Sequence, residues 1–264
     1  MGRRSVKLKI SLGQMDVVLG QPRENVSKVR EMTAEARRRG SAVVVFPELW
    51  STGYDLERVE EYATRTDEGV FAEVAELARE HSIHIIGSLL AAKDSGYSNT
   101  AVVFSPEGQL VAEYDKVHLF RDMEEDKYLV HGRKASVFDL AWGKSALAIC
   151  YDLRFPELFR RYALDGAGIV FLTAEWPYPR LMHWQTLLRA RAIENQFFMV
   201  ACNRVGESGD WSFFGHSAIY GPSGELMVGA GEEETLVTAV IDLEAIDEVR
   251  KGLTVLKDRH RDVY

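Results

Sequence analysis

The sequence Ala146-Leu-Ala-Ile-Cys150-Tyr-Asp-Leu-Arg-Phe-Pro-Glu157 joins an apolar run to the start of a helix through a short polar segment. Residues 146–149 predict a buried strand, and the proline near the end predicts the first turn of a helix, where proline is favoured. A strand, a turn and a helix in succession place one side chain at a sharp bend. Cys150 takes that position, so its sulfur is a candidate nucleophile; the alternative is a packed core cysteine, a common state of the free thiol.

The composition is that of an ordinary globular protein. The chain has 264 residues, of which 46% are hydrophobic and 27% charged, enough for one large domain or two small ones. Asp and Glu number 40 against 32 Lys and Arg, giving a formal net charge of −8. The negative net charge argues against a surface that binds nucleic acid and against binding to a membrane of anionic lipids.

The cysteine content and the apolar runs bear on location. Cys150 and Cys202 are too few for a disulfide framework in a chain of this length, and a reducing cytosol is the simplest compartment for them. No apolar stretch approaches the ~18 residues of a membrane span. Residues 1–6 lack the apolar core of a secretory leader. We therefore expect a cytoplasmic protein.

Strand and helix patterns alternate along the chain and are mixed with hairpins. Apolar and β-branched runs predict strands, and apolar residues at helical spacing predict helices. The expected strands are residues 7–18, 42–46, 84–90, 101–104, 110–114, 136–140, 144–149, 169–174, 197–203, 216–220, 225–228 and 236–242. The expected helices are residues 23–39, 67–81, 157–164, 183–195 and 244–251. The mixture predicts a single domain over residues 1–264 with two packed mixed sheets, helices outside them, and an extended tail from about residue 254.

Three polar residues each end an apolar strand. They are Glu48, Lys116 and Cys150, and polar groups at strand ends of α/β sheets commonly line the ligand crevice. A thiol beside an ammonium group has a lowered pKa, and Glu48 is suited to take the thiol proton and pass it to a leaving amine. Lys116 and the backbone N–H of Tyr151 are suited to bind an oxyanion. The alternative is that Glu48 and Lys116 are solvated surface residues.

The segments around these residues resemble the three signature blocks of the nitrilase superfamily, the carbon–nitrogen hydrolases. They are Phe46-Pro-Glu48-Leu-Trp-Ser-Thr-Gly53-Tyr54, Asp115-Lys116-Val-His118-Leu-Phe120 and Cys150-Tyr-Asp152-Leu-Arg154-Phe-Pro-Glu157, in the order of the family. Further matching stretches run from residues 13–14 to residues 258–262. The resemblance implies a four-layer αββα sandwich with two mixed six-stranded sheets, a Glu48–Lys116–Cys150 triad and hydrolysis through a thioester acyl-enzyme. It implies no metal or cofactor, and at least a homodimer.

A second glutamate belongs to the same resemblance. The segment Glu125-Asp-Lys-Tyr128-Leu-Val-His-Gly132 fits the family pattern Glu-x-x-Tyr-x-x-x-Gly. The resemblance assigns Glu125 to positioning Lys116 or the substrate. Because Glu124 stands next to it, a register shifted by one residue stays open, and so does a merely solvated loop.

A less specific resemblance, to one branch of the family, suggests the substrate. Thr173-Ala-Glu175-Trp176-Pro and the stretch from Arg180 to Arg191 resemble the ω-amidase-like branch, which hydrolyses monoamides of short dicarboxylic acids, 2-oxoglutaramate among them. An anionic substrate needs a cation, preferably the fork of an arginine, and Arg154 and Arg180 are the candidates. The expected pocket residues are Tyr54, Arg154, Glu175, Trp176 and Arg180. The favoured alternative for Arg154 is an ion pair with Asp152 or Glu157 that holds the loop, and the aromatic residues have the alternative of core packing.

The sequence therefore predicts an amide hydrolase that releases ammonia from a small ω-monoamide, with small-molecule substrates as its partners. The nearest alternative is an amidohydrolase that uses the same triad on an N-carbamoyl amine or amino acid. A different class of alternative is a non-catalytic member that binds a metabolite or a partner, although a binding module has no need of all three triad residues. A redox role is disfavoured, since the chain has no Cys-x-x-Cys pair.

Overall fold

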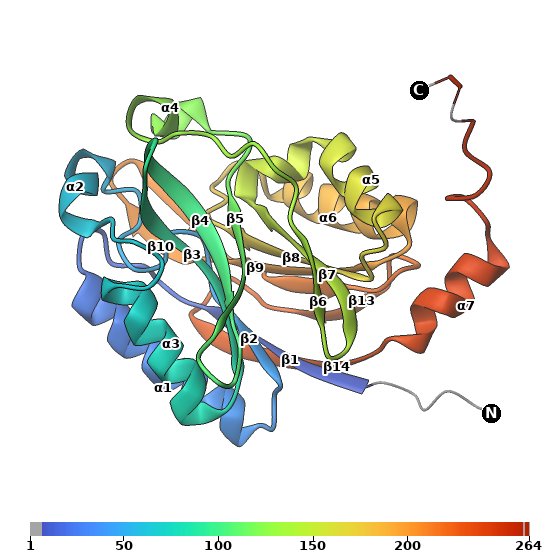
Figure 1. The fold of residues 1–264 in the computed structure, drawn as a ribbon, viewed down its shortest axis with the longest axis horizontal. Coiled ribbons are helices and arrows are strands. Elements are labelled where there is room, and N and C mark those ends of the chain that lie inside the picture. Colours follow the sequence, from blue (N-terminus) through green and yellow to red (C-terminus); the bar gives the residue numbers. More distant parts are fainter. Residues whose placement is uncertain (1–6, 261, 264) are drawn as a thin grey trace.

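Two six-stranded sheets pack face to face at the centre of the computed structural model, which describes residues 7–260, 262 and 263 (Figure 1). Helices α1 (Pro22–Arg38) and α3 (Gly69–His81) cover the outer face of one sheet, and α5 (Pro156–Leu164) and α6 (Leu181–Asn195) cover the other. This confirms the predicted αββα sandwich. The expectation that the chain has no leader concerns residues 1–6, which lie outside the described residues, as does position 261 in the matching stretch near the end.

The first sheet has the strand order β14-β1-β2-β3-β4-β5. Strands β1, β2 and β3 are parallel, whereas β14, β4 and β5 pair antiparallel with their neighbours. The sheet is therefore mixed, as expected from hairpins interspersed among strand–helix units. Its strands are β1 (Lys7–Gln14), β2 (Val43–Val45), β3 (His84–Lys93), β4 (Gly96–Phe104), β5 (Leu110–Asp115) and β14 (Thr235–Asp242).

The second sheet has the strand order β13-β12-β9-β8-β7-β6. Strands β7, β8 and β9 are parallel, and the remaining pairs are antiparallel. The strands are β6 (Val137–Leu140), β7 (Gly143–Ile149), β8 (Ile169–Ala174), β9 (Phe198–Asn203), β12 (Ala218–Tyr220) and β13 (Leu226–Gly229). A separate ribbon of β10 (Val205–Ser208) and β11 (Trp211–Phe214) was not predicted.

Side-chain alternation explains why the core strands are apolar on both faces. In β2, Val43 and Val45 belong to the core cluster that joins the two sheets, while Val44 belongs to the cluster under α1 and α3. Successive strand residues point to opposite faces, so a strand covered on both sides needs a continuous apolar run. On α1, the buried residues Val26, Val29 and Ala36 form the stripe that meets this sheet.

Several boundaries differ from the predictions: β1 ends at Gln14 and not at residue 18, and β12 begins at Ala218 and not at residue 216. Strands β3 and β4 extend beyond the expected ranges and meet in a hairpin at residues 94–95, which the polar residues of that segment concealed. After the last helix, α7 (Glu244–Gly252), the described chain continues as irregular structure with a turn from Thr254 to Lys257 and runs away from the sheets (Figure 1). No helix within the described ranges is long and apolar enough to cross a membrane.

The topology gathers several strand ends at one edge of the sandwich. Cys150 follows β7, Glu175 follows β8 and Asn203 ends β9, three parallel strands whose carboxyl ends lie together. From the other sheet, Glu48 comes shortly after β2 and Lys116 directly after β5. The predicted triad residues therefore reach the same region from both sheets.

Candidate active site

The ammonium group of Lys116 is buried between two carboxylates. Its Nζ lies 2.7 Å from Glu48 Oε1 and 2.6 Å from Glu125 Oε2, and none of the three side chains is exposed. Burial opposes the charged amine, but Glu125 and Glu48 outweigh it and raise the pKa of Lys116 above its usual value. Lys116 is therefore a permanent cation, and the alternative of solvated surface residues is wrong for both Lys116 and Glu48.

Glu125, and not its neighbour, is the second glutamate of this cluster. Glu125 begins the short helix α4 (Glu125–Tyr128), and its Oε2 also accepts a hydrogen bond from the backbone N–H of Phe120 at 2.6 Å. Glu124 is exposed and pairs with Lys127 on the surface. Burial raises the pKa of Glu125, an effect that Lys116 opposes. The structure thus resolves the open register in favour of Glu125.

Two neutral side chains complete the hydrogen bonds of the carboxylates. The Tyr54 hydroxyl lies 2.8 Å from Glu48 Oε1 and accepts a hydrogen bond from Lys116 at 3.2 Å. Asn99, on β4, donates from Nδ2 to Glu48 Oε1 at 2.8 Å and to Glu125 Oε1 at 3.1 Å. Asn99 was missed in the sequence, where its signal was a lone amide before the apolar run of β4.

Cys150 stands at a strained bend, as the strand–turn–helix pattern predicted. Its φ of 41° lies in the left-handed region, which is unusual for a residue other than glycine and marks sites held by their surroundings. The residue is 4% exposed, and its Sγ lies 3.8 Å from the carbonyl oxygen of Glu175. A 3₁₀ helix, Cys150–Arg154, follows directly and leads into α5.

The protonation of Cys150 differs from the prediction. The sequence argument expected Lys116 to lower the pKa of the thiol. Instead, burial raises this pKa well above its usual value, and Glu48 adds to the rise, while the opposing effect of Lys116 is smaller. A buried thiolate beside two carboxylates is unfavourable. The resting group is therefore a thiol, and a base must remove its proton during attack.

Asp152 holds the bend that carries Cys150. Its buried carboxylate accepts hydrogen bonds from the backbone N–H of Ile149 at 2.9 Å and from the Tyr114 hydroxyl at 2.8 Å. Asp152 Oδ1 lies 2.7 Å from His118 Nδ1, so the carboxylate ties the segment after β5 to the end of β7. Because Asp152 is engaged in this way, it forms no ion pair with Arg154.

Arg154 faces the pocket of Cys150. Its guanidinium carbon lies 4.7 Å from the ring centre of Trp176, and no carboxylate of the described residues, Glu157 included, forms an ion pair with it. The predicted ion pair that would hold the loop is therefore wrong. Partial burial lowers the pKa of Arg154. By contrast, Arg180 pairs with Asp122 at 3.1 Å and contacts the Phe120 ring.

The cavity beside the thiol is narrow. It has a volume of about 10 Å³ and is lined by Phe120, Cys150, Tyr151, Arg154, Trp176, Pro177 and Arg180. An outer hollow of about 520 Å³ shares four of these residues, Phe120, Tyr151, Arg154 and Arg180. The inner space is about the size of one water molecule.

Glu175 contributes to the site through its backbone. Its N–H donates to Glu48 Oε2 at 2.8 Å, whereas its carboxylate is buried and turned to Arg204 at 3.2 Å. Of the five residues predicted to bind substrate, Trp176, Arg154 and Arg180 line the cavity, and Tyr54 lies within the carboxylate cluster.

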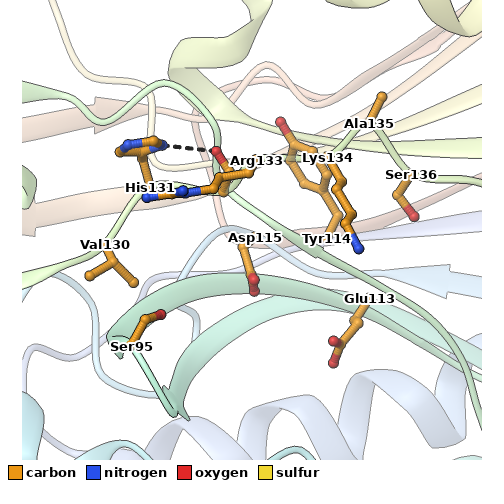
Figure 2. A pocket seen from close by; sticks show the side chains of 11 residues that line it. Ser95, Glu113, Tyr114, Asp115, Val130, His131, Arg133, Lys134, Ala135 and Ser136 are labelled. Carbon is orange, nitrogen blue, oxygen red and sulfur yellow. Dashed lines mark hydrogen bonds between the residues drawn. The ribbon is translucent and has the colours of Figure 1, made fainter.

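A separate hollow, with a volume of about 480 Å³, lies between β5 and the segment that leads to β6, and Figure 2 shows the side chains that line it. Charged residues such as Asp115, Arg133 and Lys134 line it, and His131 lies against the backbone carbonyl of Gly132 at 3.0 Å. Neither Glu48, Lys116 nor Cys150 lines this hollow. Volume alone therefore does not locate the chemistry.

The site geometry agrees with the similarity of the chain to known proteins. A family model described as carbon-nitrogen hydrolase matches residues 9–251. The 2-oxoglutaramate amidase of Bacillus subtilis (strain 168) is 43% identical over 98% of this chain and 100% of its own length. The omega-amidase NIT2 of Homo sapiens is 32% identical over 91% of both chains.

Solved structures share the fold. Nit3 of Saccharomyces cerevisiae, a member of branch 10 of the nitrilase superfamily, matches with a TM-score of 0.89 and 27% identity over 96% of this chain and 97% of its own. XC1258 of Xanthomonas campestris, a CN-hydrolase superfamily protein with an arsenic adduct in its active site, matches with a TM-score of 0.88 and 30% identity over 97% and 98%. The chain therefore belongs to the carbon–nitrogen hydrolases of the nitrilase superfamily, as its three sequence segments predicted.

Proposed function

We propose that this enzyme hydrolyses the terminal amide of a short dicarboxylic or 2-oxo acid monoamide and releases ammonia. One observation carries the choice of substrate: Arg154 lines the same cavity as Cys150 and has no ion pair with a described carboxylate. A guanidinium group that lacks a carboxylate partner within the protein is suited to bind a substrate carboxylate through paired hydrogen bonds. The names of the amidase relatives support the same class of substrate.

In the proposed first step, Cys150 Sγ attacks the amide carbon while Glu48 takes the thiol proton. A neutral thiol needs this base, because burial disfavours the thiolate. The carbonyl oxygen becomes an oxyanion, which Lys116 and the backbone N–H of Tyr151 stabilise. The permanent charge of Lys116, secured by Glu125 and Glu48, suits this role.

The tetrahedral intermediate then collapses to a thioester. The C–N bond breaks, Glu48 returns the proton to the departing nitrogen, and ammonia leaves. Glu48 next takes a proton from water, whose oxygen attacks the thioester carbon. The C–S bond breaks, the thiol is reprotonated, and the free carboxylic acid is released. The sum is one amide and one water converted into one acid and one ammonia.

The pocket residues have separate proposed roles. Arg154, stacked on Trp176, binds the distal carboxylate, and Arg180 assists from the rim where it pairs with Asp122. Tyr54 shares the hydrogen bonds of Glu48 and so orients the base. Glu175 places its backbone carbonyl against the nucleophile.

The test is ammonia release by the wild-type protein from 2-oxoglutaramate, succinamate, glutaramate, propionamide and an N-carbamoyl amino acid. We expect turnover of the ω-monoamides at least tenfold above that of propionamide. Equal turnover of propionamide would contradict the anionic substrate and leave the mechanism in place. Carbon dioxide released together with ammonia from the carbamoyl compound would identify the alternative amidohydrolase.

We also propose that the chain acts as a single domain, in the cytoplasm, as a homodimer. The family match across residues 9–251 supports one domain, and the two free cysteines suit a reducing compartment. Met182 and Ile193, 71% and 48% exposed on α6, support an interface between two copies. Light scattering on the purified protein tests the dimer, and a monomer mass would contradict it.

A further inference from the structure

The peptide groups around Glu175 connect the two reacting side chains. The N–H of Glu175 donates to Glu48 Oε2 at 2.8 Å, and its carbonyl oxygen lies 3.8 Å from Cys150 Sγ. Glu48 comes from one sheet and Cys150 from the other, so the segment after β8 sets the distance between base and nucleophile. Residues that fix the position of this segment therefore also fix the alignment of Glu48 with Cys150.

Asn203 holds the residue that follows. Its Oδ1 accepts from the N–H of Trp176 at 2.7 Å, and its Nδ2 donates to the carbonyl of Trp176 at 3.1 Å. The same Nδ2 donates to the carbonyl of Gly215 at 2.9 Å. Asn203 is fully buried at the end of β9, which pairs in parallel with β8. One side-chain amide thus satisfies both backbone groups of the tryptophan that walls the pocket.

Arg204 holds the carboxylate of Glu175 from the other side. This guanidinium is fully buried, and its Nη1 lies 3.2 Å from Glu175 Oε2. Its Nη2 donates to the carbonyl of Val17 at 2.7 Å and to Asp16 Oδ1 at 3.1 Å, in the segment after β1. The planar fork fixes several acceptors in one geometry, which an ammonium group cannot do.

Stability alone does not account for this pair. Removing two charges from water is expensive, and apolar residues of similar size often serve stability equally well. The carboxylate of Glu175 keeps one oxygen, Oε1, buried without a hydrogen bond partner among the described residues. This ion pair leaves one oxygen without a hydrogen bond, and it belongs to the residue whose peptide groups contact Glu48 and Cys150. A role in positioning these two side chains explains the pair better than stability does.

We propose that Asn203 and Arg204 are positioning residues, which lock the Glu175–Trp176 segment so that its peptide groups align Glu48 with Cys150. The inference rests on the proposed function in that Glu48 is taken as the base and Cys150 as the nucleophile. Arg204 acts only through Glu175, since it does not line the cavity beside the thiol. Loss of the Arg204–Glu175 pair therefore lowers the rate of the chemical step, while Asn203 still holds Trp176, against which Arg154 lies, so substrate binding by Arg154 is kept.

The experiment uses Arg204→Lys, which keeps the charge and loses the fork, and Glu175→Ala, which removes the tethered carboxylate and leaves Arg204 paired with Asp16. Arg161→Lys is the matched control, because Arg161 pairs with Asp165 on the exposed face of α5. We expect kcat to fall on the order of 100-fold in both test variants, as for small misplacements of reacting groups. KM should stay within about twofold of the wild-type value, which separates this effect from lost ground-state binding.

The rate at which iodoacetamide alkylates Cys150, followed by mass spectrometry, is a second readout. It is expected to fall in both variants, because Glu48 no longer accepts the thiol proton, and to stay unchanged in Arg161→Lys. This measurement needs no substrate, so wild-type protein inactive on ω-monoamides would contradict the proposed function alone. If Arg204→Lys does not fold, Glu175→Ala decides. A folded Glu175→Ala protein with wild-type kcat and an unchanged or faster alkylation rate would overturn the positioning role.

Discussion

Glu48 Oε1 lies 2.7 Å from Lys116 Nζ although the two residues are 68 positions apart in the chain. The contact joins the segment after β2 to the end of β5 and is completely buried. With Glu125 on the other side of the ammonium group, two carboxylates face one cation. Burial raises the pKa of the neighbouring Cys150 thiol, and Glu48 raises it further by more than Lys116 lowers it, so the resting thiol is protonated.

Replacement of the nucleophile is the first prediction. Cys150→Ala is expected to lower kcat on the order of 10⁴-fold or more, since the enzyme loses the group that forms the thioester. The fold should remain, as judged by circular dichroism. Cys202→Ala is the control, because Cys202 is a buried residue of β9 outside the cavity, and turnover per folded molecule should persist. Normal ammonia release by folded Cys150→Ala would refute the mechanism.

The buried cluster of Lys116, Glu48 and Glu125 predicts that stability lost with the cation is partly restored when one carboxylate is neutralised. Lys116→Met leaves two carboxylates without their cation, and breaking such a buried pair costs about 3–5 kcal/mol. The double variant Lys116→Met/Glu125→Gln removes one of the two unmatched charges and should recover part of that loss. Urea unfolding at pH 7 measures both, and neither variant should turn over substrate. A double variant less stable than the single one would argue against the repulsion of the two carboxylates.

Glu175 predicts how stability depends on pH. Burial raises the pKa of Glu175 from 4.5 to about 7, against the effect of Arg204. The folded state therefore holds this proton more tightly than the unfolded state. The contribution of this proton to the free energy of unfolding is complete below pH 4.5 and is lost as the pH rises through 7. It amounts to at most about 3 kcal/mol.

Glu175→Gln removes this titration and keeps a hydrogen-bonding group in place. The free energy of unfolding in urea, measured at pH 5 and pH 8, should fall less with rising pH in the variant than in the wild type. If the free energy of unfolding changed equally with pH in the variant and in the wild type, Glu175 would titrate outside the range from pH 5 to pH 8.

Arg154 predicts the substrate charge. Arg154→Gln should raise KM for a good ω-monoamide about 10- to 100-fold, the effect of losing a charged hydrogen bond, and should leave propionamide turnover nearly unchanged. Arg180→Gln should have a smaller effect, because Arg180 already pairs with Asp122. Initial rates over a range of substrate concentrations test both. An equal loss for the charged and the neutral amide would assign Arg154 to the loop and not to the substrate.

Local patterns predicted most of the architecture because they are properties of short segments. The run Val43–Val45 and the apolar end of β7 identify buried strands, and Pro156 identifies the start of α5. The order of these elements indicated the two mixed sheets. The hairpin of β3 and β4 and the ribbon of β10 and β11 were missed, since polar side chains interrupt their apolar pattern.

Contacts between distant segments had no local signal. Asn99 and Glu48 are 51 residues apart, and the backbone of Glu175 and the carboxylate of Glu48 are 127 apart. The role of Arg204 depends on three such neighbours, Asp16, Val17 and Glu175, which lie 188, 187 and 29 residues away in the chain. Propensity and spacing describe a residue's own segment, so they do not report which groups meet across the interior of the sandwich.

The sequence by itself determined the two mixed sheets and the residues that end the central strands, because periodicity and residue type are properties of short segments, and the resemblance of three segments indicated the family and its αββα sandwich. The tertiary structure decided between Glu125 and Glu124, freed Arg154 from the expected ion pair, and reversed the expected direction of the Cys150 pKa. Each of these depends on burial and on distances between groups from different strands. Electrostatic effects of this kind are set by the whole surroundings of a group, which exist only once the chain has folded.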